Sequence, residues 1–382
     1  MAKIKVLYIS SWDAGLQQGK VSFIYEQIEE LKKKIDASYV TIRFESRIRN
    51  LFKISTLKKK DRWEGVTCYE YIYYRWPTTI THRTQLQDFE MAAKNLAKKN
   101  NFIKPDLIHS HVVLPAGLVA AIIKQIQGVP MILQEHSAPF EMHLDTVEKE
   151  NFVNKVFKEV DKVIAVGYGL KKRLLSYLDE DKIAIIPEML STSLFSPKKA
   201  NKINGQLRIV SVGALVPRKG YDLLIEAIAQ LKENKINIHL SIAGEGSDRK
   251  RLENLIVEYS LSENVSLFGN VERTKLQELY HSANLYVHAS EKETFGIAPA
   301  EALLCGIPVV TVICEGPEYY VNDDVGSVIN NRSSDAIAEG ILKVSANLDS
   351  YNPEFLHDYI VDRFGEKSFV KKMLVVYSSL VN

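Results

Sequence analysis

Short β-rich apolar runs alternate with helical patterns along nearly the whole amino-acid sequence. This alternation is typical of parallel sheets, because neighbouring parallel strands need a helical crossover between them. In the first half of the chain it predicts strands at Ile4–Ser10, Tyr39–Phe44, Leu107–Ser110, Met131–Gln134, Val163–Val166 and Ile183–Ile186. Helices are predicted there near Val21–Lys34, Gln85–Lys99, Ala116–Gln127, Val147–Val160 and Gly169–Leu178. We therefore expect an α/β protein with doubly wound sheets.

The alternation stops at the polar stretch Phe195–Gly205, which has no apolar periodicity and predicts an interdomain linker. It resumes with strands near Arg208–Val212, Asn237–Ala243, Val265–Phe268, Leu285–His288 and Val309–Val312, and with helices starting near Lys219, Ser247, Thr274 and Ala298. We expect domains at 1–197 and 206–365, with a helix at 366–382 that packs back on the first domain. Two such domains are expected to face each other across a cleft, with a nucleotide in one half, because open α/β sheets bind ligands beyond their strands' carboxyl ends.

Composition excludes several classes of protein. The 49 Lys and Arg residues nearly balance the 47 Asp and Glu residues, so the whole chain is not an electrostatic nucleic-acid binder. The three cysteines are widely spaced and form no Cys-x-x-Cys, so we expect neither a disulfide framework nor a zinc site. We also expect no membrane-spanning helix and no signal peptide, which favours a cytoplasmic protein.

Two acidic residues, Glu293 and Glu301, stand eight positions apart after the strand predicted to end at His288. Pro299 suits the first turn of a helix, which would place Glu301 in that turn and Glu293 in the preceding loop. The backbone of Thr294–Ile297 would then present N–H groups at a helix amino terminus, a common binding site for a diphosphate. Carboxylates beside an anion would accept hydrogen bonds from sugar or ribose hydroxyls. Alternatively, the two residues are a solvated loop residue and an ordinary helix-start charge.

These residues resemble the retaining GT-B glycosyltransferases of glycosyltransferase family 4 (glycosyl transferases group 1). The resemblance rests on five motifs that occur in the family's order: Val212–Ala227, Ile242–Gly246, Gly269–Val271, Glu293–Pro308 with its E-x7-E spacing, and Glu315–Pro317. It is strong from Val210 to Gly326 and looser before that. Ala214 departs from the pattern, because many relatives carry an Arg at this position.

The resemblance implies roles for individual residues. Arg218 and Lys219 would grip the diphosphate of the donor and stabilise it as it leaves. Glu301 would hold the ribose hydroxyls, and Glu293 would hold hydroxyls of the donor sugar. His111 would lie at the mouth of the cleft, close to the transferred sugar. The other residues expected at the donor are Gly15, Gly19, Gly213, Asn270, Val271, Thr294, Phe295, Gly296 and Ile297.

The function implied is transfer of a sugar, with retention of anomeric configuration, from a nucleotide sugar such as a UDP- or GDP-sugar to a hydroxyl of a glycan or lipid-linked acceptor. Bacterial-type glycan, glycolipid or cell-surface polysaccharide synthesis is the expected setting. We expect no further cofactor and no metal, because Arg218 and Lys219 supply the cations and no Asp-x-Asp motif accompanies them. A GT-B epimerase or phosphorylase and a non-catalytic sugar-binding protein are the alternatives.

The segment from Arg47 to Arg83 is basic and aromatic, and residues 47–62 also contain apolar side chains. Such a segment could dock on an anionic membrane, which would make the protein peripheral at the inner face of the cell membrane. Lys58, Lys59 and Lys60 are the cations expected to contribute there. Its aromatics could instead stack on sugar rings or on nucleic acid, or form an ordinary β-hairpin. Of these partners we expect no nucleic acid.

Overall fold

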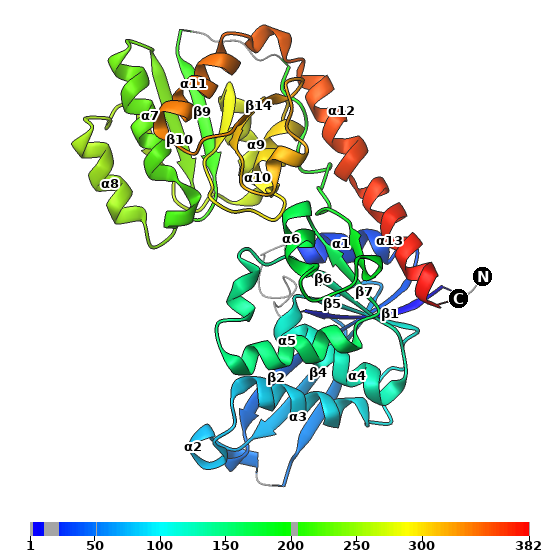
Figure 1. Cartoon of the computed structure of the whole chain (residues 1–382). Helices are drawn as coiled ribbons and strands as arrows, with labels where there is room; N and C mark the ends of the chain where they lie inside the picture. The colour runs from blue at the N-terminus through cyan, green and yellow to red at the C-terminus, as the bar shows by residue number, and fades with distance from the viewer. Residues whose placement is uncertain (1–2, 11–22, 51, 200–204, 382) are drawn as a thin grey trace. The chain divides into compact units, whose positions relative to one another are not determined.

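The computed structural model describes residues 3–10, 23–50, 52–199 and 205–381 (Figure 1). The chain divides into two compact units. Unit 1 comprises Met1–Val166, Leu170–Pro187 and Phe369–Asn382, and unit 2 comprises Gly167–Gly169 and Glu188–Ser368. Each unit contains one sheet flanked by helices, as the sequence predicts for doubly wound α/β domains.

The sheet of unit 1 has eight strands in the order β3-β4-β2-β1-β5-β6-β7-β8. Neighbouring strands are parallel except for the antiparallel pair β3 and β4. The strands are β1 (Lys5–Ser10), β2 (Asp36–Ser46), β3 (Ser55–Lys60), β4 (Val66–Arg75), β5 (Leu107–His111), β6 (Met131–Glu135), β7 (Lys162–Ala165) and β8 (Ile183–Ile185). The strand order reverses between β1 and β5, so the ends of these two strands form a switch point.

Helices pack on this sheet and bury an apolar core. The helices are α1 (Phe23–Leu31), α2 (Thr78–Thr81), α3 (Gln85–Ala97), α4 (Leu118–Gln127), α5 (Val147–Glu159) and α6 (Tyr168–Leu174). Helix α4 packs between α3 and α5. The side chains of Leu118–Ile123 are all buried in the core, because α4 lies against the sheet as well as against its neighbouring helices.

The sheet of unit 2 has six parallel strands in the order β11-β10-β9-β12-β13-β14. The strands are β9 (Leu207–Val212), β10 (Ile238–Ala243), β11 (Val265–Leu267), β12 (Leu285–His288), β13 (Val309–Val312) and β14 (Gly326–Ile329). Every residue of β12 and β13 is buried, which is typical of parallel strands covered on both faces. In chain order this sheet reads 3-2-1-4-5-6, the Rossmann order, and its switch point lies between β9 and β12.

The helices of unit 2 are α7 (Tyr221–Glu233), α8 (Arg249–Glu258), α9 (Arg273–Ser282), α10 (Ile297–Leu304), α11 (Ser334–Ser345) and α12 (Pro353–Phe364). Helix α12 begins at a signal readable in the sequence: Asn352 caps it by accepting hydrogen bonds from the N–H groups of Glu354 and Phe355, and Pro353 occupies the first helical position. The last helix, α13 (Glu366–Val381), runs from unit 2 into unit 1.

The predicted fold class is confirmed, and most predicted strands lie within a residue or two of the observed ones. The linker prediction at Phe195–Gly205 needs correction, because the main segment of unit 2 begins at Glu188. Leu190 and Phe195 are buried in the core of unit 2, so the polar residues that follow them do not mark the point where the chain changes unit. Apart from Gly167–Gly169, which also group with unit 2, the chain passes from unit 1 to unit 2 between Pro187 and Glu188, where no change in composition marks the boundary.

The C-terminal helix joins unit 1 through a buried polar contact. From Phe369 onward its residues group with unit 1. The hydroxyl of Tyr377 lies 2.9 Å from the hydroxyl of Tyr8 and 2.7 Å from Nδ1 of His109. A strand at each side of the switch point of unit 1 therefore contacts this helix.

Phe195 provides a test of where unit 2 begins. Its ring packs 6.0 Å from that of Tyr280 and is almost completely buried. We expect Phe195→Ala to destabilise unit 2 by ~3–5 kcal/mol, because it leaves a cavity in the core. Chemical unfolding combined with amide hydrogen exchange should show faster exchange in β9 and β12 than in the wild type. The control Phe268→Ala removes a ring that is 54% exposed and should change little. Unaltered exchange in Phe195→Ala would mean that this residue lies in a linker.

Candidate functional site

The candidate site lies at the carboxyl edge of the unit 2 sheet. Because the six strands are parallel, the loops that follow them emerge at the same edge. The pairing of Ile209 with Leu285 makes β9 and β12 neighbours, although they are far apart in sequence. The loops that follow these two strands therefore meet at the switch point, where open α/β sheets bind ligands.

The loop after β9 carries both predicted cations. Pro217–Lys219 forms a short 3-10 turn, and Gly220 ends this turn with φ 66°. A Cβ at Gly220 would lie 2.3 Å from the carbonyl oxygen of Ala289, so only glycine allows this close approach to the chain after β12. Arg218 donates from its guanidinium to the carbonyl oxygen of Lys292 at 3.2 Å and accepts a backbone hydrogen bond from Glu291 at 2.7 Å. The two loops are thus joined.

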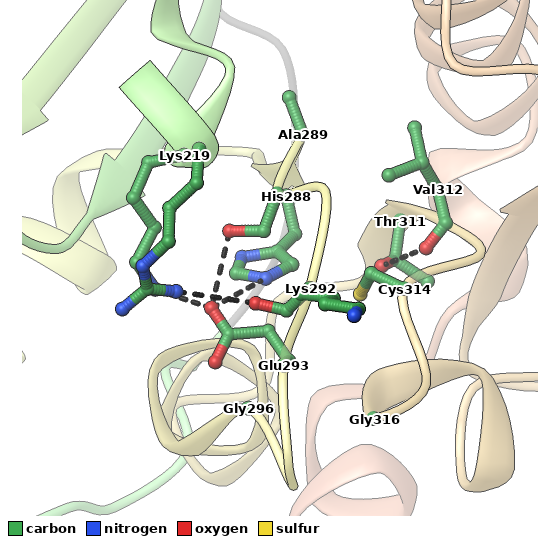
Figure 2. Close-up of polar contacts among 12 residues, drawn as sticks. Lys219, His288, Ala289, Lys292, Glu293, Gly296, Thr311, Val312, Cys314 and Gly316 are labelled. Carbon is green, nitrogen blue, oxygen red and sulfur yellow. Dashed lines mark hydrogen bonds and ion pairs between the residues drawn. The ribbon is translucent and has the colours of Figure 1, made fainter. Parts of the chain in front are cut away.

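Glu293 lies at the centre of this junction (Figure 2). Its carboxylate forms an ion pair with the ammonium group of Lys219. It also accepts a hydrogen bond from the Ser290 hydroxyl at 3.1 Å, and it lies 3.4 Å from Nε2 of His288. The side chains of Lys219 and Glu293 are only 15% and 12% exposed. The structure therefore brings together two residues that the sequence predicts to act at the donor.

Burial and neighbouring charges set the ionisation of this cluster. Burial by itself disfavours a charged Glu293, but the contact with His288 and the ammonium group of Lys219 outweigh it and lower the pKa of Glu293 well below its usual value. Burial lowers the pKa of His288, so its imidazole is neutral at neutral pH. We therefore attribute the stabilisation of the Glu293 carboxylate mainly to Lys219, while neutral His288 serves as a polar neighbour.

The amino end of α10 borders the same cluster. Gly296 precedes the helix with φ 84°, and a Cβ there would lie 2.6 Å from the ring of Pro317. Ile297 is the first residue of α10, and Thr294 lies in the loop between Glu293 and the helix. Phe295 is buried, with its ring 5.3 Å from that of Tyr320, so only its backbone is available for an anion. The helix dipole favours negative charge at this end.

The predicted position of Glu301 needs correction. Helix α10 begins at Ile297, one residue earlier than expected, so Glu301 lies beyond the first turn. Its side chain is 7% exposed. It accepts a hydrogen bond from the Tyr280 hydroxyl at 3.1 Å and another from Arg273 at 3.4 Å. Sequence reasoning missed both partners, because they come from α9 and no motif connects α9 with α10.

The other predicted donor residues of unit 2 lie at the same carboxyl edge. Gly213 follows β9 directly, and a Cβ there would lie 3.1 Å from the Tyr221 hydroxyl and 3.8 Å from Nζ of Lys219. Asn270 and Val271 lie in the loop after β11, and Asn270 is exposed. The loop that carries Glu293 follows β12. In the sheet, β10 and β9 lie between β11 and β12.

His111 ends β5 at the switch point of unit 1, where it pairs with Ser10 of β1. Its imidazole is fully buried and stacks between those of His109 and His136, with ring centroids 4.6 Å and 5.3 Å away. Its Nδ1 lies 3.0 Å from Nε2 of His136, whereas its Nε2 has no hydrogen-bond partner among the described residues. Burial, followed by the charges of His109 and His136, lowers the pKa of His111, so the ring is neutral at neutral pH.

Several residues around these sites were missed from the sequence. His288 is the last residue of its strand, as His111 is of β5. This shared position could have indicated His288 as a site residue. His109 and Tyr377 gave none, because their contact joins residues far apart in sequence. Gly15 and Gly19 lie outside the described residues. Within those residues, no three His, Cys, Asp or Glu side chains are grouped so that they could hold a metal ion.

The basic and aromatic segment forms the β3–β4 hairpin, one of the structures considered for it. Tyr71, Tyr73 and Tyr74 are buried, and Trp63 stacks on Tyr25 with ring centroids 4.5 Å apart. The suggested stacking surface for sugars or nucleic acid is therefore wrong for these four aromatics, whose rings are buried, whereas Tyr69 and Trp76 are half-buried. Among the described residues, no helix combines the length and apolar character needed to cross a bilayer.

The environment of Glu293 predicts a specific pH dependence. A carboxyl group whose pKa is lower in the folded than in the unfolded protein stabilises the fold above about pH 4.3, and this contribution is lost as the pH falls toward the folded-state pKa. We expect Glu293→Gln to lower the free energy of unfolding at neutral pH and to approach the wild type in acid. Thermal unfolding measured across this range tests the expectation. Glu291→Gln, an exposed change in the same loop, is the control. A constant difference at every pH would contradict the assignment.

Comparison with known proteins gives one family model for each half of the chain. Residues 21–194 match Glycosyltransferase Family 4, and residues 194–353 match Glycosyl transferases group 1. A phosphatidylinositol N-acetylglucosaminyltransferase subunit of Arabidopsis thaliana is 24% identical over 277 residues, which cover 72% of this chain and 62% of that protein. The chain thus spans less than two thirds of that relative's length.

Two solved structures share the complete fold. Sucrose-phosphate synthase from Thermosynechococcus elongatus superposes with a TM-score of 0.76 at 18% identity, covering 98% of this chain and 99% of that one. Anabaena HepE in complex with UDP superposes with a TM-score of 0.74 at 18% identity, covering 99% and 100% of the two chains. With both halves matched and the two Rossmann-like sheets in place, the chain belongs to the glycosyltransferases of the GT-B fold, with a family 4 region followed by a group 1 region.

Proposed function

We propose that the protein is a retaining glycosyltransferase that moves a sugar from a nucleoside diphosphate sugar to a hydroxyl of a glycan or lipid-linked acceptor. The observation that carries this proposal is the junction of Arg218 and Lys219 with Glu293 at the switch point of unit 2. The HepE structure contains UDP, which supports a uridine nucleotide as the first donor to test. The name of the Arabidopsis relative includes phosphatidylinositol, which supports a lipid-linked acceptor.

The two cations and the amino end of α10 are suited to a leaving diphosphate. As the bond between the anomeric carbon and the phosphate oxygen breaks, negative charge grows on the diphosphate. Lys219, Arg218 and the helix dipole stabilise this charge more in the transition state than in the bound donor, which lowers the barrier. In this proposal the diphosphate competes with Glu293 for the ammonium group of Lys219.

The two carboxylates serve different parts of the donor. Glu293 remains ionised at neutral pH because its pKa is lowered, so its oxygens accept hydrogen bonds from hydroxyls of the sugar. Glu301 is held by Tyr280 and Arg273, which fix its carboxylate for the ribose hydroxyls. A fixed carboxylate loses little conformational entropy when the nucleotide binds.

Retention follows in this proposal from a reaction on one face of the sugar. The bond from the anomeric carbon to the diphosphate oxygen breaks, the bond to the acceptor oxygen forms on the same face, and the acceptor proton passes to the leaving diphosphate oxygen. His111 supplies a neutral imidazole whose buried Nε2 has no hydrogen-bond partner among the described residues, and in this proposal a hydroxyl of the transferred sugar becomes that partner. No metal or further cofactor is invoked, because Arg218 and Lys219 provide the positive charge.

Calorimetry with UDP and with UDP-glucose separates the roles of the two carboxylates. We expect Glu301→Ala to weaken binding of both ligands, because both contain the ribose. Glu293→Ala should not weaken UDP binding, because loss of the competing carboxylate leaves Lys219 to the diphosphate, and it should weaken UDP-glucose relative to UDP, because the carboxylate contacts the sugar. Glu291→Ala is the control, since Glu291 is exposed in the same loop. Equal losses for both ligands in both variants would contradict these roles, and the same screen with GDP and ADP ligands identifies the base.

Turnover tests the diphosphate assignment. We expect Arg218→Ala and Lys219→Ala each to raise the barrier by ~2–4 kcal/mol, which is about a 30- to 1,000-fold loss of kcat, with a smaller loss in donor binding. Lys250→Ala, which alters an 83% exposed side chain on α8, is the control. Unchanged kcat in both site variants would exclude the assignment.

The products distinguish the alternatives to transfer. NMR of the glycoside should show the same anomeric configuration as the donor sugar, and inversion would contradict retention. Interconversion of the nucleotide sugar without an acceptor would favour an epimerase. Release of the sugar phosphate from a glycan by inorganic phosphate would favour a phosphorylase. Sugar binding without turnover of any donor would favour a binding protein.

A further inference from the structure

One edge of the unit 1 sheet carries a compact surface made from two segments. Ser46 at the end of β2 pairs with Arg75 at the end of β4, and Ser55 at the start of β3 pairs with Tyr73. The connections 47–54 and 76–83 therefore leave the sheet at the same edge, and the N–H of Arg47 donates to the carbonyl oxygen of Arg75 at 2.8 Å. We call the described residues of 46–54 and 76–83 the basic tip.

Large apolar side chains protrude from the basic tip. Phe52 is 100% exposed, and Ile48, Ile54 and Ile80 are 53%, 50% and 60% exposed. Two turns shape the first connection, because Asn50 donates to the carbonyl oxygen of Arg47 and Lys53 donates to that of Asn50, both at 2.9 Å. Scattered apolar side chains are ordinary on a protein surface, but several gathered on one projecting edge indicate a surface that another phase or molecule covers.

The charge of the basic tip has a single sign. Its two segments contain Arg47, Arg49, Lys53 and Arg83 and no Asp or Glu. Arg49 and Lys53 are exposed beside the apolar residues. The guanidinium of Arg47 lies 5.7 Å from the ring of Trp76, which joins the two segments. The surface is therefore complementary to an anionic partner that also accepts apolar side chains.

We propose that the basic tip docks unit 1 on a bilayer of anionic phospholipid. Ile48, Phe52 and Ile54 enter the boundary between headgroups and acyl chains, while Arg49 and Lys53 stay among the anionic headgroups. A nucleic acid would attract the cations but would leave protruding aliphatic side chains without apolar partners. An anionic bilayer accommodates both the cations and the protruding apolar side chains. Insertion of the apolar side chains distinguishes a bilayer from other anionic partners.

The cations that contact the headgroups in this proposal differ from those expected from the sequence. The sequence indicated Lys58, Lys59 and Lys60, which the structure places on β3. Lys60 forms an ion pair with Glu70 at 3.4 Å, and Arg43 and Arg62 pair with the same carboxylate. Lys58 and Lys59 are exposed on the strand rather than in the connection that carries Phe52. They therefore provide a charge-matched control for Arg49 and Lys53.

Vesicle co-sedimentation of the full chain tests the charges. We expect the wild type to sediment with vesicles of phosphatidylcholine plus phosphatidylglycerol, and much less with phosphatidylcholine alone or at raised salt. Each cation near the surface contributes about fivefold in affinity, from ~1 kcal/mol. The double variant Arg49→Glu/Lys53→Glu should therefore bind at least about 25-fold more weakly. Lys58→Glu/Lys59→Glu makes the same change in net charge and should have a much smaller effect.

A second pair of variants tests insertion. Phe52→Ser should weaken binding about 10- to 100-fold, because it removes an aromatic side chain that the bilayer would bury. Val147→Ser is the control, since Val147 is 75% exposed on α5 of the same unit. Absence of vesicle binding by the wild type overturns the proposal. Equal losses of vesicle affinity in Arg49→Glu/Lys53→Glu and in Lys58→Glu/Lys59→Glu overturn it as well. Phe52→Ser binding like the wild type overturns insertion and leaves a purely electrostatic contact.

The docking test is independent of the proposed transfer reaction. It uses no nucleotide and no acceptor, and none of its variants alters Arg218, Lys219, Glu293, Glu301 or His111. Thermal unfolding of each variant shows whether it is folded. An active transferase that fails to bind vesicles would overturn only the docking proposal, and a vesicle-binding protein without transferase activity would overturn only the proposed function.

Discussion

The parallel pairing of β9 with β12 is the constraint on which the candidate site of unit 2 depends. The register that places Ile209 beside Leu285 and Val210 beside Tyr286 brings the two following loops to the same point. The chain between these strands forms the β10–β11 side of the sheet, and the chain after β12 forms the other side. A ligand site at this position needs no special cavity-forming residue, since the crossovers on either side diverge from it.

The junction at this point combines backbone fit with charge. Gly220 allows the β9 loop to lie against the carbonyl of Ala289, and this approach brings Lys219 to Glu293. Because both side chains are largely buried, their attraction is screened less by water than that of a surface pair. The ion pair also avoids leaving an isolated carboxylate in a site that is expected to bind an anion. A single geometry thus holds the two loops together and places Lys219 beside Glu293 at the switch point.

Unit 1 uses a different arrangement at its own switch point. Three imidazoles stack at the ends of β5 and β6, and Tyr377 of the C-terminal helix contacts the first of them. The Tyr8 hydroxyl extends this contact to β1. Stacking on His109 and the contact of its Nδ1 with Nε2 of His136 fix the plane of the His111 ring, so its Nε2 has a defined direction. The last helix of the chain therefore contributes to the position of a residue more than two hundred places earlier.

The sequence by itself determined most of the strands, the two-sheet architecture and which residues the loops at the switch point of unit 2 carry. These features are local: a parallel strand needs a buried apolar run, and a phosphate-binding turn needs glycine and a cation within a few residues. The tertiary structure decided what depends on contacts between distant elements. Phe195 joined the core of unit 2 although polar residues follow it, and Tyr280 and Arg273 became partners of Glu301. Likewise, Tyr71 entered the core while Phe52 stayed exposed, although both lie in the same basic, aromatic segment. Composition could not separate them, because strand pairing determines which side chain faces the core.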